Sequence, residues 1–439
     1  MKVRLFCFTL ALLTCFLSAC QSSLASRDTW EGPKTTEEQK EEKPYEYPKV
    51  ANPLSWEKIR AIPLANSNMT EAELRKICTD FMRLQLTFEW TPAKSITYNF
   101  YTKESDMEFP RGKVYGGLPY MTFNANGNLY IVMDYYDPET GILDPGDVPL
   151  KHFASIIGND CAASPFWAWN RVINSLTNFK DPENKRGFTN IDLTPHHNLI
   201  PVGGYRSISE GTWDDGDGTK WVCEVNGKQK IFECYAKLQE ADGIVHFFPD
   251  APRSANHLMM CSSTATVVKN EDGTIDGDQS YVTILDQRSN MTPTYTKNGV
   301  VLYEGGIDAV FTFNQLYQEY YIPFTFKEFL GTDPVEKGEA KLVVDGDMYD
   351  YETLREGKII SNYGISHVRI TYFDKEGNEK YSYRAIPTLL NTRDFDLENL
   401  LLPASKWHAT EENTCVITAF IGTGEEFELL RGTVLPQNS

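Results

Sequence analysis

The pattern of apolar and polar positions predicts two packing helices in the first half of the chain. Apolar residues recur at helical spacing from 70 to 89, where Thr70 precedes Glu71 and Glu73 in the manner of an N-cap. A second helical pattern runs from 161 to 176 and places its large apolar side chains on one face. We therefore expect two amphipathic helices, the second of which begins at a cysteine.

Short alternating or apolar runs, separated by turn residues, predict β-structure in the rest of the chain. The first is NLYIVM at residues 128–133, and from residue 220 onwards come KWVCEV, KIFECYAKL, GIVHFF, HLMMCSSTATVV and SYVTILD. Beyond residue 291, HVRITYF and KYSYRAI flank DKEGNE, while TCVITAF and EFELLRG flank GTGE. Alternation on both sides of a turn predicts two β-hairpins there.

These elements predict an α+β fold, with helices packed on an antiparallel sheet, for residues 51–290. Residues 291–439 carry strand patterns without a helical core, so we expect a β-sandwich-like ancillary domain there. The sequence identifies no ligand or partner for this second domain.

The N-terminus has the pattern of an export signal. Lys2 and Arg4 precede an apolar run that ends in Leu-Ser-Ala-Cys at Cys20, which resembles a bacterial lipobox. We expect residues 1–19 to be removed, Cys20 to carry lipid, and the exported protein to be anchored to the membrane of the cell envelope. Residues 20–50 are rich in Ser, Thr, Glu, Lys and Pro, which predicts a flexible tether.

Charge and composition exclude two classes of protein. The chain has 61 acidic and 42 basic side chains, a formal net charge of -19, which argues against binding to the phosphates of nucleic acid. With 41% hydrophobic and 13% aromatic residues among 439, it has enough apolar surface for a substantial core, so most of it is not intrinsically disordered.

Nine cysteines raise the questions of disulfides and metal binding. In an exported protein, Cys223 and Cys234 are the nearest candidates for a disulfide, on flanking predicted strands. Cysteines and histidines do not occur at the spacing of a zinc site, so we expect no structural metal.

The segment GNDCAASPFWAWNRV, residues 158–172, is the most informative for chemistry. A cysteine at the start of a helix is placed where the unsatisfied N–H groups favour a thiolate. A nucleophilic cysteine also needs a histidine that accepts its proton and a polar group that orients the imidazole. Those partners have to come from other elements of the chain.

The motifs that follow occur in a familiar order. LQEADGIVHFFP (238–249) is followed by SANHLMMCSS (254–263) and SYVTILDQ (280–287). Over residues 110–290 the chain resembles the NlpC-type and CHAP cysteine peptidases and amidases of bacterial cell walls, which share a papain-like arrangement. In those families a DCSG-like motif holds the nucleophile, a histidine begins a later strand, and a polar residue lies on the next strand.

The resemblance implies a role for individual residues. Cys161 matches the nucleophile, His257 the base, and Asp286 or Gln287 the group that orients the imidazole. Asp160 matches an aspartate that binds the free amine of a wall peptide.

Tyr115 or Tyr120, in KVYGGLPYMTF, matches a tyrosine that lines the substrate cleft. The implied reaction is hydrolysis of an amide bond in a peptidoglycan peptide by acyl transfer, with an oxyanion hole at the Cys161 N–H and its neighbours. No metal or organic cofactor is required.

Two points remain open in the sequence. His246 also lies on a predicted strand, but it falls inside the strand motif rather than after it, so we interpret it as a sheet histidine. Ala162 and Ala163 replace the serine and glycine that follow the nucleophile in the families. The alternative is therefore a catalytically inactive papain-like scaffold that binds glycan or protein at the cell surface.

Overall fold

The computed structural model describes residues 45–99, 106–120, 127–148, 153, 156–174, 199–207, 218–246, 257–287, 295–297, 300–302, 306–387, 390–401 and 413–434. The chain divides into two units, Met1–Glu46 and Tyr47–Ser439, and every described helix and strand lies in the second. The expected signal peptide, the lipidated Cys20 and the tether up to residue 44 lie outside the described residues.

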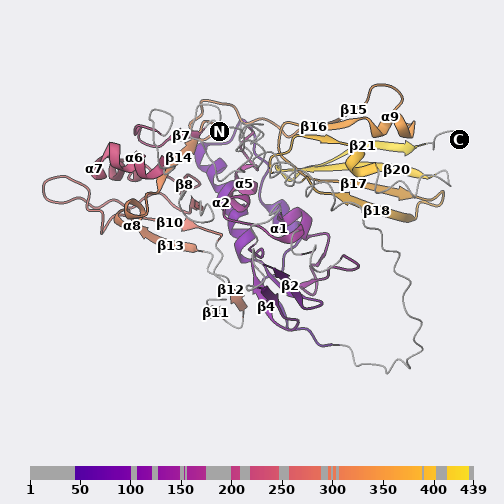
Figure 1. Cartoon of the computed structure of the whole chain (residues 1–439), viewed down its shortest axis with the longest axis horizontal. Helices are drawn as coiled ribbons and strands as arrows, with labels where there is room; N and C mark the ends of the chain where they lie inside the picture. Colours follow the sequence, from indigo (N-terminus) through magenta and orange to yellow (C-terminus); the bar gives the residue numbers. More distant parts are fainter. Residues whose placement is uncertain are drawn as a thin grey trace, which may run out of the picture. The chain divides into compact units, whose positions relative to one another are not determined.

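The described helices are short, with one exception (Figure 1). They are α1 Trp56–Ala61, α2 Glu71–Thr87, α3 Leu129–Val132, α5 Ala163–Trp169, α6 Gly218–Asn226, α7 Lys228–Tyr235, α8 Phe313–Gln318 and α9 Tyr351–Arg355. The exception, α2, has 17 residues and begins as predicted. Its Thr70 hydroxyl accepts a hydrogen bond from the Glu73 N–H (3.3 Å), and the Glu73 carboxylate accepts one from the Thr70 N–H (2.8 Å).

Two six-stranded sheets lie in the part of the chain before residue 330 (Figure 1). The first has the order β11-β12-β4-β1-β6-β5, with β1 Glu89–Pro92, β4 Val114–Gly116, β5 Tyr136–Asp137, β6 Ile142–Leu143, β11 Tyr295–Lys297 and β12 Val300–Leu302. The second has the order β13-β10-β9-β8-β14-β7, with β7 Leu199–Pro201, β8 Gly243–His246, β9 His257–Cys261, β10 Tyr281–Leu285, β13 Ile307–Thr312 and β14 Ile322–Phe326. Strands from both sides of residue 290 therefore share each sheet.

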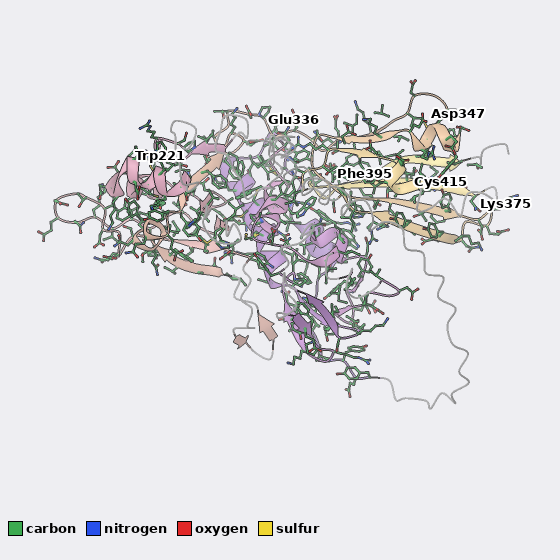
Figure 2. All side chains as sticks on the ribbon, in the orientation of Figure 1. Trp221, Glu336, Asp347, Lys375, Phe395 and Cys415 are labelled. Carbon is green, nitrogen blue, oxygen red and sulfur yellow. The ribbon has the colours of Figure 1, made fainter. Side chains whose placement is uncertain are left out.

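Three smaller sheets complete the described structure. Strands β2 Ile96–Asn99 and β3 Asp106–Phe109 pair in antiparallel register as a two-stranded sheet. The other two contain β15 Ala340–Val343, β16 Lys358–Ser361 and β19 Asp394–Asp396, and β17 Ile365–Phe373, β18 Glu379–Ala385, β20 Thr414–Ile421 and β21 Glu426–Thr433. The last sheet confirms both predicted hairpins, because β17 pairs with β18 and β20 with β21 in antiparallel register. Phe395 and Cys415 lie in the buried core of these strands (Figure 2).

The expected fold class is wrong. The described residues form mostly small antiparallel sheets in an arrangement like a four-bladed β-propeller, with few helices, and not a papain-like α+β domain followed by a β-sandwich-like domain. Apart from α2, no described helix exceeds nine residues, which is too short to form the helical layer that we expected over a sheet. Alternation along a strand predicts its buried face and does not specify which sheets pack together.

Three predicted strands are helices. NLYIVM contains α3, KWVCEV lies in α6, and the first six residues of KIFECYAKL lie in α7. Short apolar runs fit either period, and here consecutive side chains such as Val222 and Cys223 are both buried, as on the inner face of a helix. Cys223 and Cys234 are consequently buried helical residues, and among the described residues neither forms the expected disulfide.

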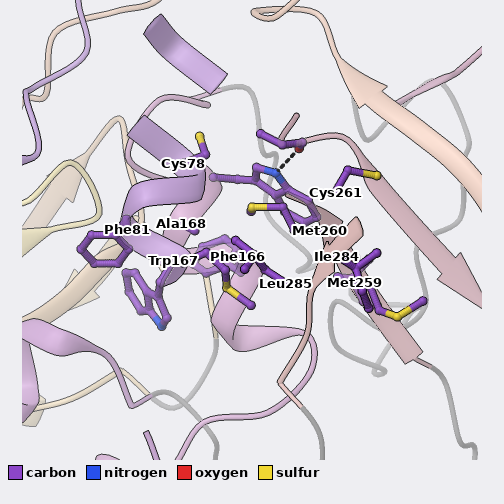
Figure 3. Close-up of a cluster of buried hydrophobic side chains, with 14 of the residues drawn as sticks. Cys78, Phe81, Phe166, Trp167, Ala168, Met259, Met260, Cys261, Ile284 and Leu285 are labelled. Carbon is purple, nitrogen blue, oxygen red and sulfur yellow. Dashed lines mark hydrogen bonds between the residues drawn. The ribbon is translucent and has the colours of Figure 1, made fainter. Parts of the chain in front are cut away.

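The largest core joins α2 and α5 to the second sheet. Figure 3 shows its buried side chains, with Phe81 from α2, Phe166 and Trp167 from α5, Met259 from β9 and Leu285 from β10. All five are at most 1% exposed. This core fixes the start of α5 relative to β9 and β10, the three places where the predicted chemical groups occur.

Candidate active site

His257 and Asp286 meet at the edge where β9 begins and β10 ends. His257 Nε2 lies 2.9 Å from Asp286 Oδ1 in an ion pair. The Asp286 side chain is fully buried, while that of His257 is 18% exposed. A carboxylate in this position holds the imidazole in one orientation and favours its protonated form, which is the role predicted for Asp286.

Cys161 lies in the turn that leads into α5. The Asp160 carboxylate accepts hydrogen bonds from the N–H groups of Ala162 (2.9 Å) and Ala163 (2.7 Å), and the Asp160 carbonyl accepts one from Ser164 (3.1 Å). Asp160 therefore acts as the cap of this turn. Burial raises the pKa of Asp160 to about 6, against the lowering effect of the two N–H groups and of His257.

The helix after Cys161 is shorter than predicted. It ends at Trp169 rather than at residue 176, so it has about two turns. Gln85 of α2 donates a hydrogen bond to the Ser164 carbonyl (2.9 Å), and the Trp169 indole donates one to the Ala241 carbonyl (2.8 Å). These two bonds fix both ends of α5 against α2 and the segment before β8.

The thiol of Cys161 contacts the His257 imidazole. Burial lowers the pKa of His257, but the charge of the Asp286 carboxylate 2.9 Å away and the neighbouring Cys161 raise it more, to about 10. The imidazole is therefore protonated at neutral pH. Since its Nε2 faces Asp286, its Nδ1 is left for proton transfer with the sulfur. Cys161, 5% exposed, His257 and Asp286 thus come together as the sequence motifs predicted.

Tyr120 joins this cluster, because its hydroxyl forms a hydrogen bond with Cys161. Burial first, and then the neighbouring Cys161 and Asp160, raise the pKa of Tyr120 well above its usual value, so its hydroxyl keeps its proton. The segment before Tyr120 lies close to the end of α2. Gly117 has φ of 73°, and a Cβ there would lie 2.7 Å from the Leu86 carbonyl oxygen, so only glycine fits.

Gln287, the alternative orienting group, has a different role. Its side chain donates a hydrogen bond to the Leu118 carbonyl (2.8 Å) and so ties the end of β10 to the Tyr120 segment. On the other side, the Asn159 N–H donates to the Pro119 carbonyl (2.9 Å). The segment before Tyr120 is therefore bound on one side by Gln287, next to Asp286, and on the other by Asn159, next to Asp160.

Tyr115, the other candidate for the cleft, lies elsewhere. It is 2% exposed on β4, and its ring packs against Trp90 (centroids 5.0 Å apart) and Phe109 (5.2 Å). Of the two tyrosines in KVYGGLPYMTF, the structure brings Tyr120 to the thiol and places Tyr115 in this aromatic cluster.

His246 is fully buried on β8, directly opposite His257 in the antiparallel pair of β8 and β9. Burial and the charge of His257 lower the pKa of His246 to about 3, so it is neutral at neutral pH. A neutral, buried imidazole agrees with its interpretation as a sheet histidine.

Tyr321 is a neighbour of His257 that the sequence did not predict. Its ring centroid lies 6.4 Å from that of His257, edge to face, although it comes from beyond the residues that resemble the peptidases. A single buried tyrosine before a short strand carries no motif from which this contact can be predicted.

Metal sites, cavities and membrane-spanning helices would each indicate a different function. Within the described ranges, no group of three or more His, Cys, Asp or Glu side chains has the geometry of a metal site. One cavity of about 960 Å³ is lined by residues 134–137, 142 and 144–148, and another of about 420 Å³ by residues 337–341, 360–362 and 427. Neither is lined by a residue of the Cys161 cluster. Among the helices of the described part, none has the length and apolar character required to cross a bilayer.

Comparison with known proteins gave no relative of this chain. No protein-family model matches it, and no curated protein or solved structure matches it either.

Proposed function

We propose that this protein is a cysteine hydrolase that cleaves amide bonds in peptidoglycan peptides by acyl transfer. The observation that carries the proposal is the cluster in which the Cys161 thiol contacts His257 and His257 Nε2 lies 2.9 Å from the buried Asp286. Nucleophile, base and orienting group are the three parts that this reaction requires.

In the first step, the Cys161 sulfur attacks the carbonyl carbon of the amide and forms a C–S bond. The imidazolium of His257 gives its Nδ1 proton to the amide nitrogen as the C–N bond breaks, so the amine leaves in neutral form. The product on the enzyme is a thioester. Asp286 holds the ring in place and stabilises its positive charge before the proton moves.

In the second step, His257 accepts a proton from water, whose oxygen attacks the thioester carbonyl. The C–S bond then breaks, the acid product leaves, and sulfur and imidazole return to their initial state. Every proton that His257 gives in the first step is thus recovered in the second.

The oxyanion donors differ from those expected from the sequence. The N–H groups of Ala162 and Ala163, neighbours of the nucleophile, donate to Asp160. We assign the role instead to the Tyr120 hydroxyl, which lies at the thiol and keeps its proton, together with the Cys161 N–H.

The substrate class rests on the sequence. The order of the motifs around Cys161, His257 and Asp286 resembles wall peptidases and amidases, and the lipobox-like Cys20 predicts export to the envelope, where peptidoglycan peptides occur. Asp160 is the residue proposed to bind the free amine of such a peptide, although in this structure its carboxylate caps the Cys161 turn.

Replacement of Cys161 tests the proposal. We expect the Cys161→Ala protein to release no peptides from purified peptidoglycan, measured by mass spectrometry, whereas Cys415→Ala, which alters a buried cysteine in the C-terminal sheets, retains activity. A Cys161→Ala protein that digests peptidoglycan as fast as the parent contradicts the proposal.

Thiol labelling separates an enzyme from an inactive scaffold. Paired with the His257 imidazolium, Cys161 is expected to react with iodoacetamide at pH 6, where an ordinary buried thiol is inert. Absence of labelling in the folded protein favours a binding role at the cell surface.

A further inference from the structure

The residues after 290 contribute to the surroundings of the His257 imidazole. Strand β14 pairs with β8 through Ile322 and Val245, so the next residue on each side, Tyr321 and His246, lie opposite one another. His246 is in turn opposite His257 across β8 and β9. Side chains at opposite positions of an antiparallel sheet share a face. Tyr321, His246 and His257 therefore form a row across three neighbouring strands.

The three rings in this row are in contact. The Tyr321 ring meets His246 edge to face at a centroid distance of 5.2 Å (interplanar angle 80°) and His257 at 6.4 Å (75°). Tyr321 is 3% exposed and His246 is fully buried. Because the Tyr321 and His246 rings are large and buried, they restrict rotation of the His257 ring. They also exclude water from the side of the His257–Asp286 pair that they cover.

We propose that Tyr321 is a positioning residue of the reaction, whose ring holds the His257 imidazole in the orientation that faces Cys161 and Asp286 at once. This inference rests on the proposed hydrolase function. It also extends the active site beyond residues 110–290, which resemble the peptidases, because the supporting ring comes from the segment that leads into β14.

The backbone of Tyr321 is well suited to this role, since it is fixed from two elements. Its N–H donates to the Leu316 carbonyl of α8 (2.9 Å), and its carbonyl accepts a hydrogen bond from the Tyr235 hydroxyl of α7. His246 adds a neutral imidazole to the row, so it supports the His257 ring without repelling its charge.

Two substitutions separate the ring from the hydroxyl. Tyr321→Phe keeps the ring, and we expect its kcat to stay within about twofold of the parent. Tyr321→Met fills similar volume without a ring plane, and we expect kcat to fall about tenfold or more with little change in KM, because the base is less often in line with the sulfur. Tyr317→Met is the matched control. Tyr317 lies in α8, and its ring packs on Phe232 of α7 (centroids 6.0 Å apart).

A second readout needs no substrate. We expect the rate of Cys161 alkylation at pH 6, relative to that at pH 9, to fall severalfold in Tyr321→Met and to stay unchanged in Tyr321→Phe and Tyr317→Met. A general loss of stability would alter both rates and not their ratio. The inference is overturned if Tyr321→Met has the alkylation ratio and kcat of the parent. It is also overturned if Tyr321→Phe loses as much as Tyr321→Met does.

The outcomes for the two proposals are distinct. If Cys161→Ala is inactive but Tyr321→Met has the kcat and alkylation ratio of the parent, only the positioning role is rejected. If Cys161→Ala is active, the hydrolase function is rejected. In that case the alkylation ratio alone decides whether Tyr321 positions His257. If Tyr321→Met does not fold, nuclear Overhauser contacts are measured in the unaltered protein. Contacts between the Tyr321 and His257 ring protons support the inference, and their absence overturns it.

Discussion

His257 Nε2 lies 2.9 Å from Asp286 Oδ1, and the register of two strands explains why. Strands β9 and β10 pair Met260 with Leu285, so the next position places Asp286 opposite Met259. Residues two apart on a strand share a face, which makes His257 a diagonal neighbour of Asp286. A shift of the register by one residue would place the carboxylate on the other face.

Replacement of Asp286 by asparagine tests this relationship. We expect Asp286→Asn to lower kcat by about 100-fold or more, because the neutral amide no longer stabilises the charge of the imidazolium. The pH profile of Cys161 alkylation measures the loss of the ion pair. Asp308→Asn is the control, since it removes an exposed carboxylate that pairs with Arg83 and should retain activity. Equal activity in both proteins would exclude an orienting role for Asp286.

The charge of His257 also predicts how stability depends on pH. Its pKa is about 10 in the folded protein and 6.5 in the unfolded chain, so its contribution is fully present below pH 6.5 and is lost as the pH rises through 10. We expect the free energy of unfolding, measured with urea, to fall between pH 7 and pH 10 by more in the parent than in His257→Asn. Parallel curves for the two proteins would show that His257 carries no such charge.

The two tyrosines of KVYGGLPYMTF form a matched pair. We expect Tyr120→Phe to lower kcat by about 100-fold, which is typical for loss of one oxyanion donor, because its hydroxyl lies at the Cys161 thiol. Tyr115→Phe should leave kcat unchanged, since the ring stays in its aromatic cluster. Steady-state kinetics on one peptide substrate measures both. A similar loss in both proteins, or in neither, contradicts the assignment of Tyr120.

Asp160 is predicted to have separable structural and binding roles. Asp160→Ala loses the bonds accepted from Ala162 and Ala163 and should be less stable than Asp160→Asn, which also lacks the charge, by about 1 kcal/mol, measured with urea at pH 8.

Asp160→Asn keeps an oxygen for these bonds and removes a buried charge. Because burial raises the pKa of Asp160 to about 6, its contribution to stability is present below about pH 3.8 and lost as the pH rises through 6, so at pH 8 Asp160→Asn should be at least as stable as the parent. If the carboxylate binds a substrate amine, KM rises in Asp160→Asn. An unchanged KM restricts Asp160 to its capping role.

Local patterns in the sequence were sufficient to predict several helices and strands correctly. The capping box at Thr70, the two C-terminal hairpins and the strands that hold His246, His257 and the residues before Asp286 follow from residue type and spacing over a few positions. The same patterns failed for NLYIVM, KWVCEV and KIFECYAKL, which are helical, because short apolar runs satisfy both periods. The division of the chain into domains, the lipid anchor and the reaction remain predictions.

The sequence by itself determined which groups were available: a cysteine before a helix, a histidine at the start of a strand and an aspartate at the end of the next. Only the tertiary structure decided which of them meet. In the folded chain Asp286, not Gln287, lies beside His257, and Tyr120, not Tyr115, lies at the thiol. Tyr321, from beyond residue 290, also contacts the His257 ring. The tertiary structure also replaced the expected papain-like fold by mostly small antiparallel sheets. The physical reason is that strand register and the packing of distant segments depend on contacts that no local pattern encodes.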